Sequence, residues 1–404
     1  MRTKILTLVG VRPNYTRLAS LIRRFDLDTN NSIEHVLVHT GQHYSTELYS
    51  NFLHSLGLRK PDFDLGVGHL LREMGVTDPR AQIPVLLDKF LGILQKIQPD
   101  IVVMTGDTNT VLASIIASRF PTALVHIEAG LRSYDWRMPE EKNRIIIDHL
   151  ADALYCYLEC HRKILHSEGI DERRITVVGN VIIDTLYDHM SSIDASSIMR
   201  RLGLAHKKFF LCTIHRVENT NQKDTLEWKL RNILEYASRY NIPVVAPFMP
   251  RTVQVMERFG LHDILSDPLL IVTEPLGFFD FARLEKDARL IISDSGTVQE
   301  EAFILGTPLV IARRSSERPE VIQTGAAILE GMEGARTLHD AIERGMRLSK
   351  SWDQEALNPQ GGSPSDRIHQ DIIEKIQNNF FKKSRTLDYN SQNVFVRQAF
   401  ALDV

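Results

Sequence analysis

The sequence predicts an α/β protein with two doubly wound parallel sheets, one in each half of the chain, each covered by helices on both faces. Three observations lead to this fold. Short β-branched runs alternate with longer segments of helical periodicity, which is typical of a parallel sheet buried on both faces. This series occurs twice, and a polar stretch at residues 188–197 separates the two occurrences. At 404 residues, the chain also exceeds the size of one comfortable hydrophobic core.

Each half contains a series of predicted strands with helical segments between them. In the first half we expect strands at residues 5–11, 35–39, 101–105, 123–127, 153–157 and 175–178, and helices at residues 16–25, 83–97 and 111–119. In the second half we expect strands at residues 209–213, 243–247, 269–272, 290–293, 308–312 and 326–329. Helices at residues 338–348 and 368–381 close the second half.

This pattern divides the chain into two domains and a tail. We expect a first domain at residues 1–187, a second domain at residues 188–370, and a C-terminal helix and tail at residues 371–404. The tail after Arg385 is predicted to pack back on the body, with contact to a partner chain as the alternative. Two such domains in tandem form a cleft at the carboxyl ends of their strands, where doubly wound sheets bind ligands.

Composition and charge argue against several classes of protein. A hydrophobic content of 43% and a charged content of 25% are ordinary for a globular protein. The net charge of -3 gives no electrostatic reason to expect nucleic acid or an anionic membrane as partner. No apolar stretch approaches the roughly 18 residues of a membrane span, and the N-terminal apolar run reads as a strand instead of a secretory signal. Cys156, Cys160 and Cys212 fit a reducing compartment and lack metal-site spacing. We therefore expect a cytoplasmic protein without a metal.

Charged residues gather where the strands of the first half end. Arg12 and Arg17 follow the first strand, and guanidinium groups beside a helix N-terminus suit an anion, although an arginine that caps a loop by chance fits equally well. Asp107 follows the third strand, where it could simply cap the next helix. Glu128 lies at a buried strand end, where an acid is costly unless it is paired or functional. Glu128 is therefore the strongest candidate of the four.

A second group of charged residues follows these strands in the chain. Glu140 and Glu141 lie at a helix start, where acids are ordinary, and Arg144 lies one turn further, where it could pair with either of them. His215 follows the first strand of the second half, and a lone histidine after a strand is more often structural than catalytic. None of these positions is specific by itself.

The strongest local feature lies between a strand and a helix of the second half. Ser295-Gly296-Thr297 describes a nest of backbone N–H groups at a helix N-terminus, which suits a phosphate. An ordinary capped helix start is the alternative. Glu301 lies about one turn into this helix, within reach of a ribose diol if a nucleotide is bound there.

Three blocks of sequence, in their order and spacing, resemble the non-hydrolysing UDP-N-acetylglucosamine 2-epimerase family. They are Gly106-Asp107-Thr108, then the HIEAGLR and PEEKNR segments at residues 126–144, then the DSGT and ERPE segments at residues 294–320. The resemblance runs from about residue 4 to about residue 373. It implies the glycosyltransferase-B architecture, with two Rossmann-like domains around a nucleotide-sugar cleft, and a homodimer.

The resemblance implies inversion at C2 of a UDP-N-acetylhexosamine for cell-surface polysaccharide precursors, most simply between UDP-N-acetylglucosamine and UDP-N-acetylmannosamine. The C2 proton is not acidic, but departure of UDP from C1 gives oxocarbenium character that allows a carboxylate to remove it. UDP and a 2-acetamidoglycal-like intermediate stay trapped while a proton returns to the opposite face. No cofactor is required, which agrees with the lack of a Gly-x-Gly-x-x-Gly fingerprint.

The resemblance also implies roles for individual residues. Asp107, Glu128 and Glu140 match catalytic acids, without showing which one takes the proton, and His215 matches a histidine near the sugar and phosphates. Leu276 and Phe281 match the uracil pocket, Ser295-Gly296-Thr297 the diphosphate loop, and Glu301 the ribose contact. The candidate anion-binding residues are Arg12, Arg17, Arg144 and Arg318.

The sequence departs from the family pattern at several positions. Asn14 replaces a common Glu in the first loop, so the hydrogen bonds there are expected to differ. Thr297 replaces a common second Gly. Together with the segments at residues 39–44 and 275–277, it favours a branch that acts on other UDP-N-acetylhexosamines, of the N-acetylfucosamine or diacetamido-sugar pathways. Met249 stands where relatives often carry His, which puts a polar contact near the diphosphate in doubt. The loop after Gln42-His43 lacks residues that some members use to bind an activating UDP-N-acetylglucosamine, so no allosteric activation is expected.

Three alternatives remain open at this point. A glycosyltransferase would share the fold, but it would leave the three acids unexplained. A hydrolysing epimerase would release UDP and free N-acetylmannosamine, and the complete Glu317-Arg318-Pro319-Glu320 block argues against it. A non-catalytic nucleotide-sugar sensor would have kept the cleft, but it would have no use for intact acids and His215.

Overall fold

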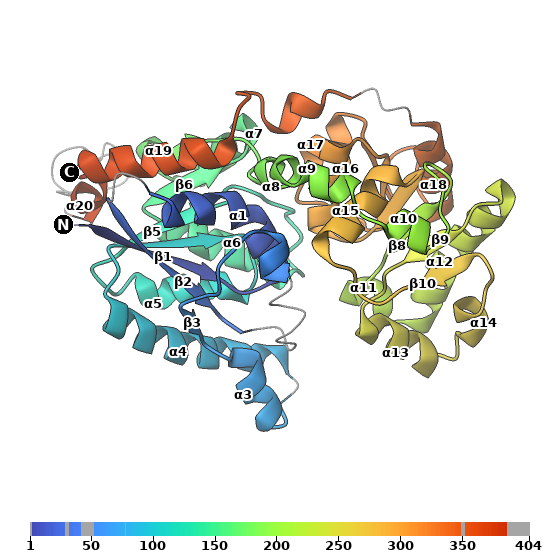
Figure 1. Ribbon diagram of the computed structural model, residues 1–404, viewed down its shortest axis with the longest axis horizontal. Coiled ribbons are helices and arrows are strands. Elements are labelled where there is room, and N and C mark those ends of the chain that lie inside the picture. The colour runs from blue at the N-terminus through green and yellow to red at the C-terminus, as the bar shows by residue number, and fades with distance from the viewer. Residues whose placement is uncertain (1, 29–31, 42–51, 77, 349–351, 386–404) are drawn as a thin grey trace, which may run out of the picture.

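The computed structural model describes residues 2–28, 32–41, 52–76, 78–348 and 352–385. Gln42, His43 and the tail after Arg385 lie outside these residues, as do the expectations for an activator loop and for the role of the tail. The chain forms two parallel sheets that lie beside one another, each flanked by helices (Figure 1). The predicted α/β class with two Rossmann-like units is therefore confirmed. No helix of the described residues is long and apolar enough to cross a membrane.

The first sheet is built from the first half of the chain. Its seven strands are parallel, in the order β3-β2-β1-β4-β5-β6-β7. They are β1 (Thr3–Val9), β2 (Ile33–His39), β3 (Phe63–Asp64), β4 (Ile101–Thr105), β5 (Ala123–Ile127), β6 (Ala153–Cys156) and β7 (Ile175–Val177). The strand order reverses between β1 and β4, which is the switch point where doubly wound sheets bind ligands.

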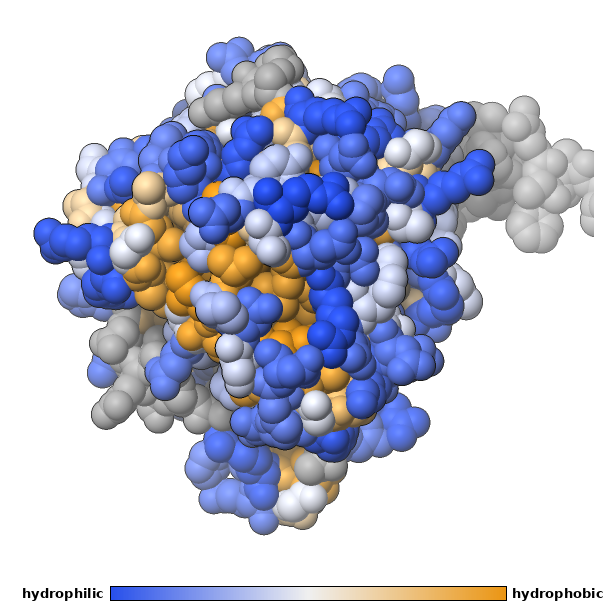
Figure 2. All heavy atoms as spheres, turned by 90° about the vertical axis from the view of Figure 1, so that its right-hand side faces the viewer, coloured by the Kyte–Doolittle hydropathy of each residue, from blue (hydrophilic) through white to orange (hydrophobic). Residues whose placement is uncertain are grey.

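The second sheet repeats this arrangement. Its six strands are parallel, in the order β10-β9-β8-β11-β12-β13, with the switch point between β8 and β11. They are β8 (Phe210–Thr213), β9 (Val244–Ala246), β10 (Leu270–Val272), β11 (Leu290–Ser293), β12 (Leu309–Ile311) and β13 (Ala327–Leu329). Figure 2 views this half from its outer side, where exposed apolar side chains form a patch bordered by hydrophilic ones.

Helices cover both faces of each sheet. Those that precede residue 180 are α1 (Arg12–Asp26), α3 (Val67–Glu73), α4 (Gln82–Ile97), α5 (Ser114–Ala117), α6 (Pro139–Leu150) and α7 (Glu159–Ser167). Those that follow, up to the second sheet's centre, are α8 (Ile182–Asp188), α9 (Met190–Asp194), α10 (Ile198–Arg201), α11 (Val217–Thr220), α12 (Lys223–Tyr240), α13 (Pro250–Arg258) and α14 (His262–Leu265). The remainder are α15 (Phe278–Asp287), α16 (Gly296–Leu305), α17 (Pro319–Gln323), α18 (Leu338–Arg347), α19 (Pro364–Gln377) and α20 (Phe380–Arg385).

Several predicted boundaries were wrong, for physical reasons. The first strand ends at Val9, and α1 begins at Arg12 because Pro13 favours a helix start and Asn14 caps it. Residues 109–113 form a 3₁₀ turn before α5, where a single helix was predicted. The two-residue strand β3 was missed because it is too short to show a period.

The two sheets are connected through a helical region, and the chain then returns to the first half. The polar stretch at residues 188–197 contains α9, and α8 before it packs on both α1 and α16. Helix α19 packs on α1 and α8, so the end of the described chain lies over the first sheet (Figure 1). One apolar cluster runs through this region, with Leu18 of α1, Ile182 of α8 and Phe303 of α16 among its members. The domain boundaries at residues 187 and 370 stay predictions.

Candidate active site

The predicted site residues lie at the carboxyl ends of the central strands of both sheets. In the first half, Asp107 follows β4, Glu128 follows β5, Arg12 and Arg17 lie on α1, and Glu140 and Arg144 lie on α6. In the second half, His215 follows β8, Ser295 caps α16, and Arg318 caps α17. These residues lie at the switch points of the two sheets, and together they define the candidate site.

A group of buried charges joins the two halves. Arg17 Nε lies 3.1 Å from Glu128 Oε2, and Arg318 Nη2 pairs with Glu128 Oε1. Glu300 of α16 pairs with both arginines, at 3.5 Å from Arg17 Nη2 and 3.1 Å from Arg318 Nε. We call Arg17, Glu128, Glu300 and Arg318 the buried ion-pair cluster, since none of the four is more than 6% exposed. Its members come from both halves, so it holds the two halves together at the site.

Glu128 is held in an unusual backbone conformation. Its φ is +79°, in the left-handed region, which costs free energy for a residue with a side chain and is found mostly at functional sites. Gly106 of the neighbouring strand end has φ +76°, and a Cβ there would lie 3.3 Å from Glu128 Oε2. Burial raises the pKa of Glu128 above its ordinary value, although Arg17 and Arg318 act in the opposite direction.

Asp107 is paired differently from Glu128. Its carboxylate pairs with Arg144 of α6, and its side chain is 24% exposed. Desolvation would raise the pKa of Asp107, but Arg144 lowers it below the ordinary value. Arg144 Nη1 also lies 2.6 Å from Glu141 Oε2, and Glu141 accepts the backbone N–H groups of Ser133 and Tyr134. The pair of Arg144 with Glu141 is one that the sequence analysis allowed, whereas the pair of Arg144 with Asp107 was not predicted.

Glu140 and His215 are the most exposed of the four predicted catalytic residues. The Glu140 side chain is 33% exposed and lies 3.9 Å from Arg216 Nη1 of the other half. The His215 side chain is 42% exposed, and its Nδ1 lies 3.0 Å from Asp294 Oδ1. Asp294 also accepts the backbone N–H groups of His215 and Arg216. Because Asp294 holds Nδ1, Nε2 is the ring nitrogen available to a ligand.

Asp294 is buried at the end of β11. Its burial would raise its pKa, but the hydrogen bond and charge of His215 lower it below the ordinary value. The Asn219 amide adds a further hydrogen bond to Oδ2, at 2.9 Å. Asp294 therefore orients the His215 ring, a role that the sequence analysis did not assign although Asp294 directly precedes the predicted phosphate loop.

The predicted phosphate loop begins a ten-residue helix, α16. A Cβ at Gly296 would lie 2.5 Å from Glu317 Oε1, so only glycine fits between this carboxylate and the loop. Thr297 Oγ1 accepts a hydrogen bond of 3.2 Å from Arg17 Nη2, which gives the Gly-to-Thr departure a contact with the other half. Glu317 is buried, and its pKa stays below the ordinary value because Arg318 and Arg313 outweigh its burial.

Glu301, the predicted ribose contact, is 6% exposed beside the fully buried Glu285 of α15. Burial and the charge of Glu300 raise the pKa of Glu301 to about 7. The contact between Glu301 and a ribose stays a prediction.

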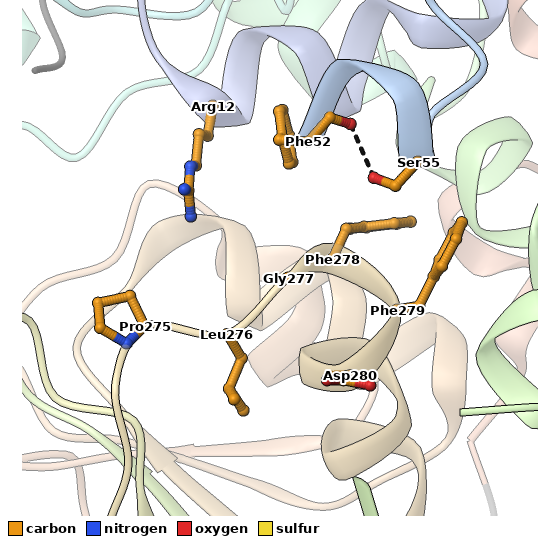
Figure 3. A pocket seen from close by; sticks show the side chains of 9 residues that line it. All are labelled: Arg12, Phe52, Ser55, Pro275, Leu276, Gly277, Phe278, Phe279 and Asp280. Atoms are coloured by element: carbon orange, nitrogen blue, oxygen red, sulfur yellow. Dashed lines mark hydrogen bonds between the residues drawn. The ribbon is translucent and has the colours of Figure 1, made fainter. Parts of the chain in front are cut away.

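A pocket of about 330 Å³ lies between the start of α1 and the segment at residues 275–280 (Figure 3). Arg12 and Phe52 line it from the first half, and residues 275–280, including Leu276, line it from the second half. The Arg12 guanidinium lies 5.4 Å from the centre of the Phe52 ring. Phe281, the other predicted uracil residue, packs against the apolar core instead and is not part of this lining. Among the described residues, no carboxylate pairs with Arg12.

Asn14 and Met249, the other two residues that depart from the family pattern, lie at the starts of helices. Asn14 Oδ1 accepts the backbone N–H groups of Gly10 and Val11, and its Nδ2 donates to the Thr105 carbonyl, so Asn14 ties the first loop to β4. Met249 caps α13 and is 48% exposed. Among the described residues, no group of three or more His, Cys, Asp or Glu side chains could hold a metal ion.

Comparisons with known proteins agree with this fold and site. The family model of UDP-N-acetylglucosamine 2-epimerase matches residues 26–372. A UDP-N-acetylglucosamine 2-epimerase of Methanocaldococcus jannaschii is 35% identical over 371 residues, with 90% of this chain and 97% of the relative covered. The UDP-2,3-diacetamido-2,3-dideoxy-D-glucuronate 2-epimerase of Pseudomonas aeruginosa is 33% identical, with 90% of this chain and 98% of the relative covered.

A solved structure gives the same answer. The UDP-GlcNAc 2-epimerase of Methanocaldococcus jannaschii in complex with UDP-GlcNAc and UDP matches with a TM-score of 0.83 at 33% identity. The match covers 92% of this chain and 100% of that chain. The resemblance drawn from the sequence is thereby confirmed, and the chain belongs to the UDP-N-acetylglucosamine 2-epimerase family.

Proposed function

We propose that this chain is a non-hydrolysing epimerase that inverts C2 of a UDP-N-acetylhexosamine, with UDP-N-acetylglucosamine and UDP-N-acetylmannosamine as the substrate pair. The observation that carries the proposal is the position of Glu128. This acid of the first half lies between two arginines, one from each half, and one of them, Arg17, also donates to Thr297 in the predicted phosphate loop. Family membership and the UDP-GlcNAc complex of the relative support the same substrate class.

UDP is the leaving group of the proposed reaction, and the second half provides its binding site. The α16 N-terminus presents backbone N–H groups of Gly296 and Thr297, and its dipole favours a diphosphate. Arg12, which has no carboxylate partner among the described residues, adds a guanidinium that stays charged at neutral pH. We assign the uracil ring to the pocket of Figure 3, which Leu276 lines. These contacts stabilise the charge that develops when the C1–O bond breaks.

The carboxyl groups of the first half move the C2 proton. Asp107 and Glu128 have pKa values displaced in opposite directions, and such pairs suit opposite acid and base roles. In one direction ionised Asp107 takes the proton and protonated Glu128 returns one to the other face; the reverse reaction exchanges the roles. Glu140 is the third acid of the proposal. His215, oriented by Asp294, contacts the sugar or phosphate through Nε2, which donates when both ring nitrogens carry a proton.

A second substrate has specific support. The diacetamido-glucuronate epimerase relative is about as similar as the N-acetylglucosamine epimerase relative, at 33% against 35% identity. Thr297, in place of a second Gly, favours a branch that acts on other UDP-N-acetylhexosamines. UDP-2,3-diacetamido sugars are therefore the second substrate class to test. A cytoplasmic location and a homodimer belong to the proposal as well.

The test is incubation with UDP-N-acetylglucosamine in deuterated water, followed by NMR of C2 and of the anomeric phosphate. The proposal predicts deuterium at C2 with UDP still attached, in both epimers. Free sugar and UDP would show a hydrolysing enzyme, and transfer that requires an added acceptor would show a transferase. If neither UDP-N-acetylglucosamine nor the diacetamido sugar exchanges C2–H, the epimerase proposal is wrong.

A further inference from the structure

Glu300 contacts the arginines of the site, yet the proposed reaction gives it no task. It lies on α16 and is 0% exposed, so a substrate in the cleft cannot reach it. Its Oε1 lies 3.1 Å from Arg318 Nε and its Oε2 lies 3.5 Å from Arg17 Nη2. Asn180, two residues before α8, donates from Nδ2 to Oε1 at 2.7 Å. Glu300 is therefore held by a residue of each half.

The buried ion-pair cluster is balanced in charge only when Glu300 is included. Arg17 and Arg318 supply two positive charges, and Glu128 and Glu300 supply two negative ones. A buried guanidinium that loses its partner is strongly unfavourable. If Glu128 gains a proton during the reaction, Glu300 remains the carboxylate that contacts both guanidinium groups. Glu317, which also pairs with Arg313, contacts Arg318 but not Arg17.

We propose that Glu300 is a positioning residue for the epimerisation, which holds Arg17 and Arg318 on either side of Glu128 while Glu128 changes its protonation state. This inference rests on the proposed function, because it requires Glu128 to exchange a proton with the substrate. Glu300 acts through the two arginines and through its charge, without touching the sugar.

The proposal gives a sign for the effect on Glu128. The negative charge of Glu300 opposes that of the Glu128 carboxylate, so it raises the pKa of Glu128. Removing that charge leaves two guanidinium groups beside Glu128 and lowers its pKa. The charged and titratable groups that face Glu128 come from five elements: Arg17 of α1, Asp107 after β4, Tyr157 after β6, Glu300 of α16 and Arg318 at the start of α17.

Two substitutions separate the charge of Glu300 from its reach. Glu300→Gln keeps the size but removes the charge, so kcat should fall about tenfold or more. At least one limb of the pH profile of kcat/KM should also move to lower pH by about one unit. Glu300→Asp keeps the charge but is one methylene shorter, so it cannot span both arginines. Its kcat should fall while both limbs stay at wild-type pH.

The matched control is Glu330→Gln, which removes a buried carboxylate of the same half from its pair with Lys229 of α12. It should lower the melting temperature without moving either limb of the pH profile. This control shows what a purely structural loss of a buried ion pair does to the enzyme.

Wild-type kcat in either Glu300 variant, or a Glu300→Gln enzyme with lowered kcat but unmoved limbs, overturns the inference. If Glu300→Gln does not fold, Glu300→Asp decides: a lower kcat with unmoved limbs supports the inference, and a moved limb overturns it. A wild-type enzyme that exchanges deuterium at C2 of neither UDP-N-acetylglucosamine nor the diacetamido sugar refutes the proposed function itself, a result distinct from an unmoved limb in an active enzyme.

Discussion

The buried ion-pair cluster and the pocket of Figure 3 lie in one site but have opposite physical characters. In the cluster, Arg17 and Arg318 are almost fully buried; Arg17 is paired with two carboxylates and Arg318 with three, Glu317 being the third. In the pocket, Arg12 lies against an aromatic ring and has no carboxylate partner among the described residues. The ion-pair cluster pairs its arginines with carboxylates of the protein, whereas the pocket contains Arg12, which has no such partner in the part of the chain that the structure describes.

This difference indicates a division of labour. Groups that are preorganised in a buried setting suit chemistry, because they need no rearrangement when charge develops in the transition state. An open, partly apolar pocket with an unpaired cation suits a ligand that must enter and leave. Substitutions in the two regions test these two roles.

The acids of the site should show the largest effect. Asp107→Asn, Glu128→Gln and Glu140→Gln should each lower kcat by at least about a hundredfold, the usual scale for a lost general acid or base. Turnover is measured with UDP-N-acetylglucosamine, and UDP binding by calorimetry should persist in each variant. Rates near wild type in all three variants would refute the assignment of the acids.

Arg12→Met should affect binding more than turnover. It removes a charge-assisted contact to the diphosphate, so the Kd for UDP should rise about tenfold to a hundredfold while kcat falls less. The matched control is Arg173→Met, an exposed arginine paired with Asp171 at the surface, which should bind UDP as wild type does. Unchanged UDP affinity in Arg12→Met would place the diphosphate elsewhere.

Asp294→Asn should reveal a pH-dependent contribution to stability. The pKa of Asp294 is lowered in the folded state, so its stabilisation is present above about pH 4 and is lost as the pH falls through the folded pKa. Urea unfolding at pH 7 should therefore show a loss of about 1–3 kcal/mol in the variant, and the difference from wild type should narrow below pH 4. A difference that does not depend on pH would contradict the ion pair with His215.

The smallest effect is expected at Asn14. Asn14→Ala removes the side-chain acceptor for the Gly10 and Val11 N–H groups, so the free energy of unfolding should fall by about 1 kcal/mol. Asn14→Asp keeps an acceptor for both N–H groups but loses the Nδ2 donor to the Thr105 carbonyl, so it should recover only part of that loss. Equal stability of the alanine variant and wild type would show that water replaces the cap.

The fold was predictable because it depends on patterns along the chain. Buried parallel strands appear as short β-branched runs, and all of the predicted strands are present with small shifts at their ends. The start of α1 at Arg12 was signalled by Pro13 but was placed too late, since the preceding apolar run appeared to continue through Val11. The two-residue strand β3 gives no period to detect.

The site was predictable in location but not in pairing. Residues at strand ends must gather at one edge of each sheet, so Asp107, Glu128 and Ser295 could be chosen from the sequence. Which guanidinium meets which carboxylate depends on how the two halves are placed, and periodicity carries no information on that. Glu300 was overlooked for this reason: its partners Arg17 and Arg318 are distant in sequence, and in the chain it reads as an ordinary helical acid.

A crystal structure of this chain with UDP would examine the whole arrangement at once. It should show the diphosphate on the Gly296 and Thr297 N–H groups and beside Arg12, with uracil in the pocket of Figure 3 and room for one sugar between the β-phosphate and the Asp107 and Glu128 carboxylates. Density for UDP away from the α16 N-terminus, or a β-phosphate separated from both acids by more than the length of a hexose, would contradict the account.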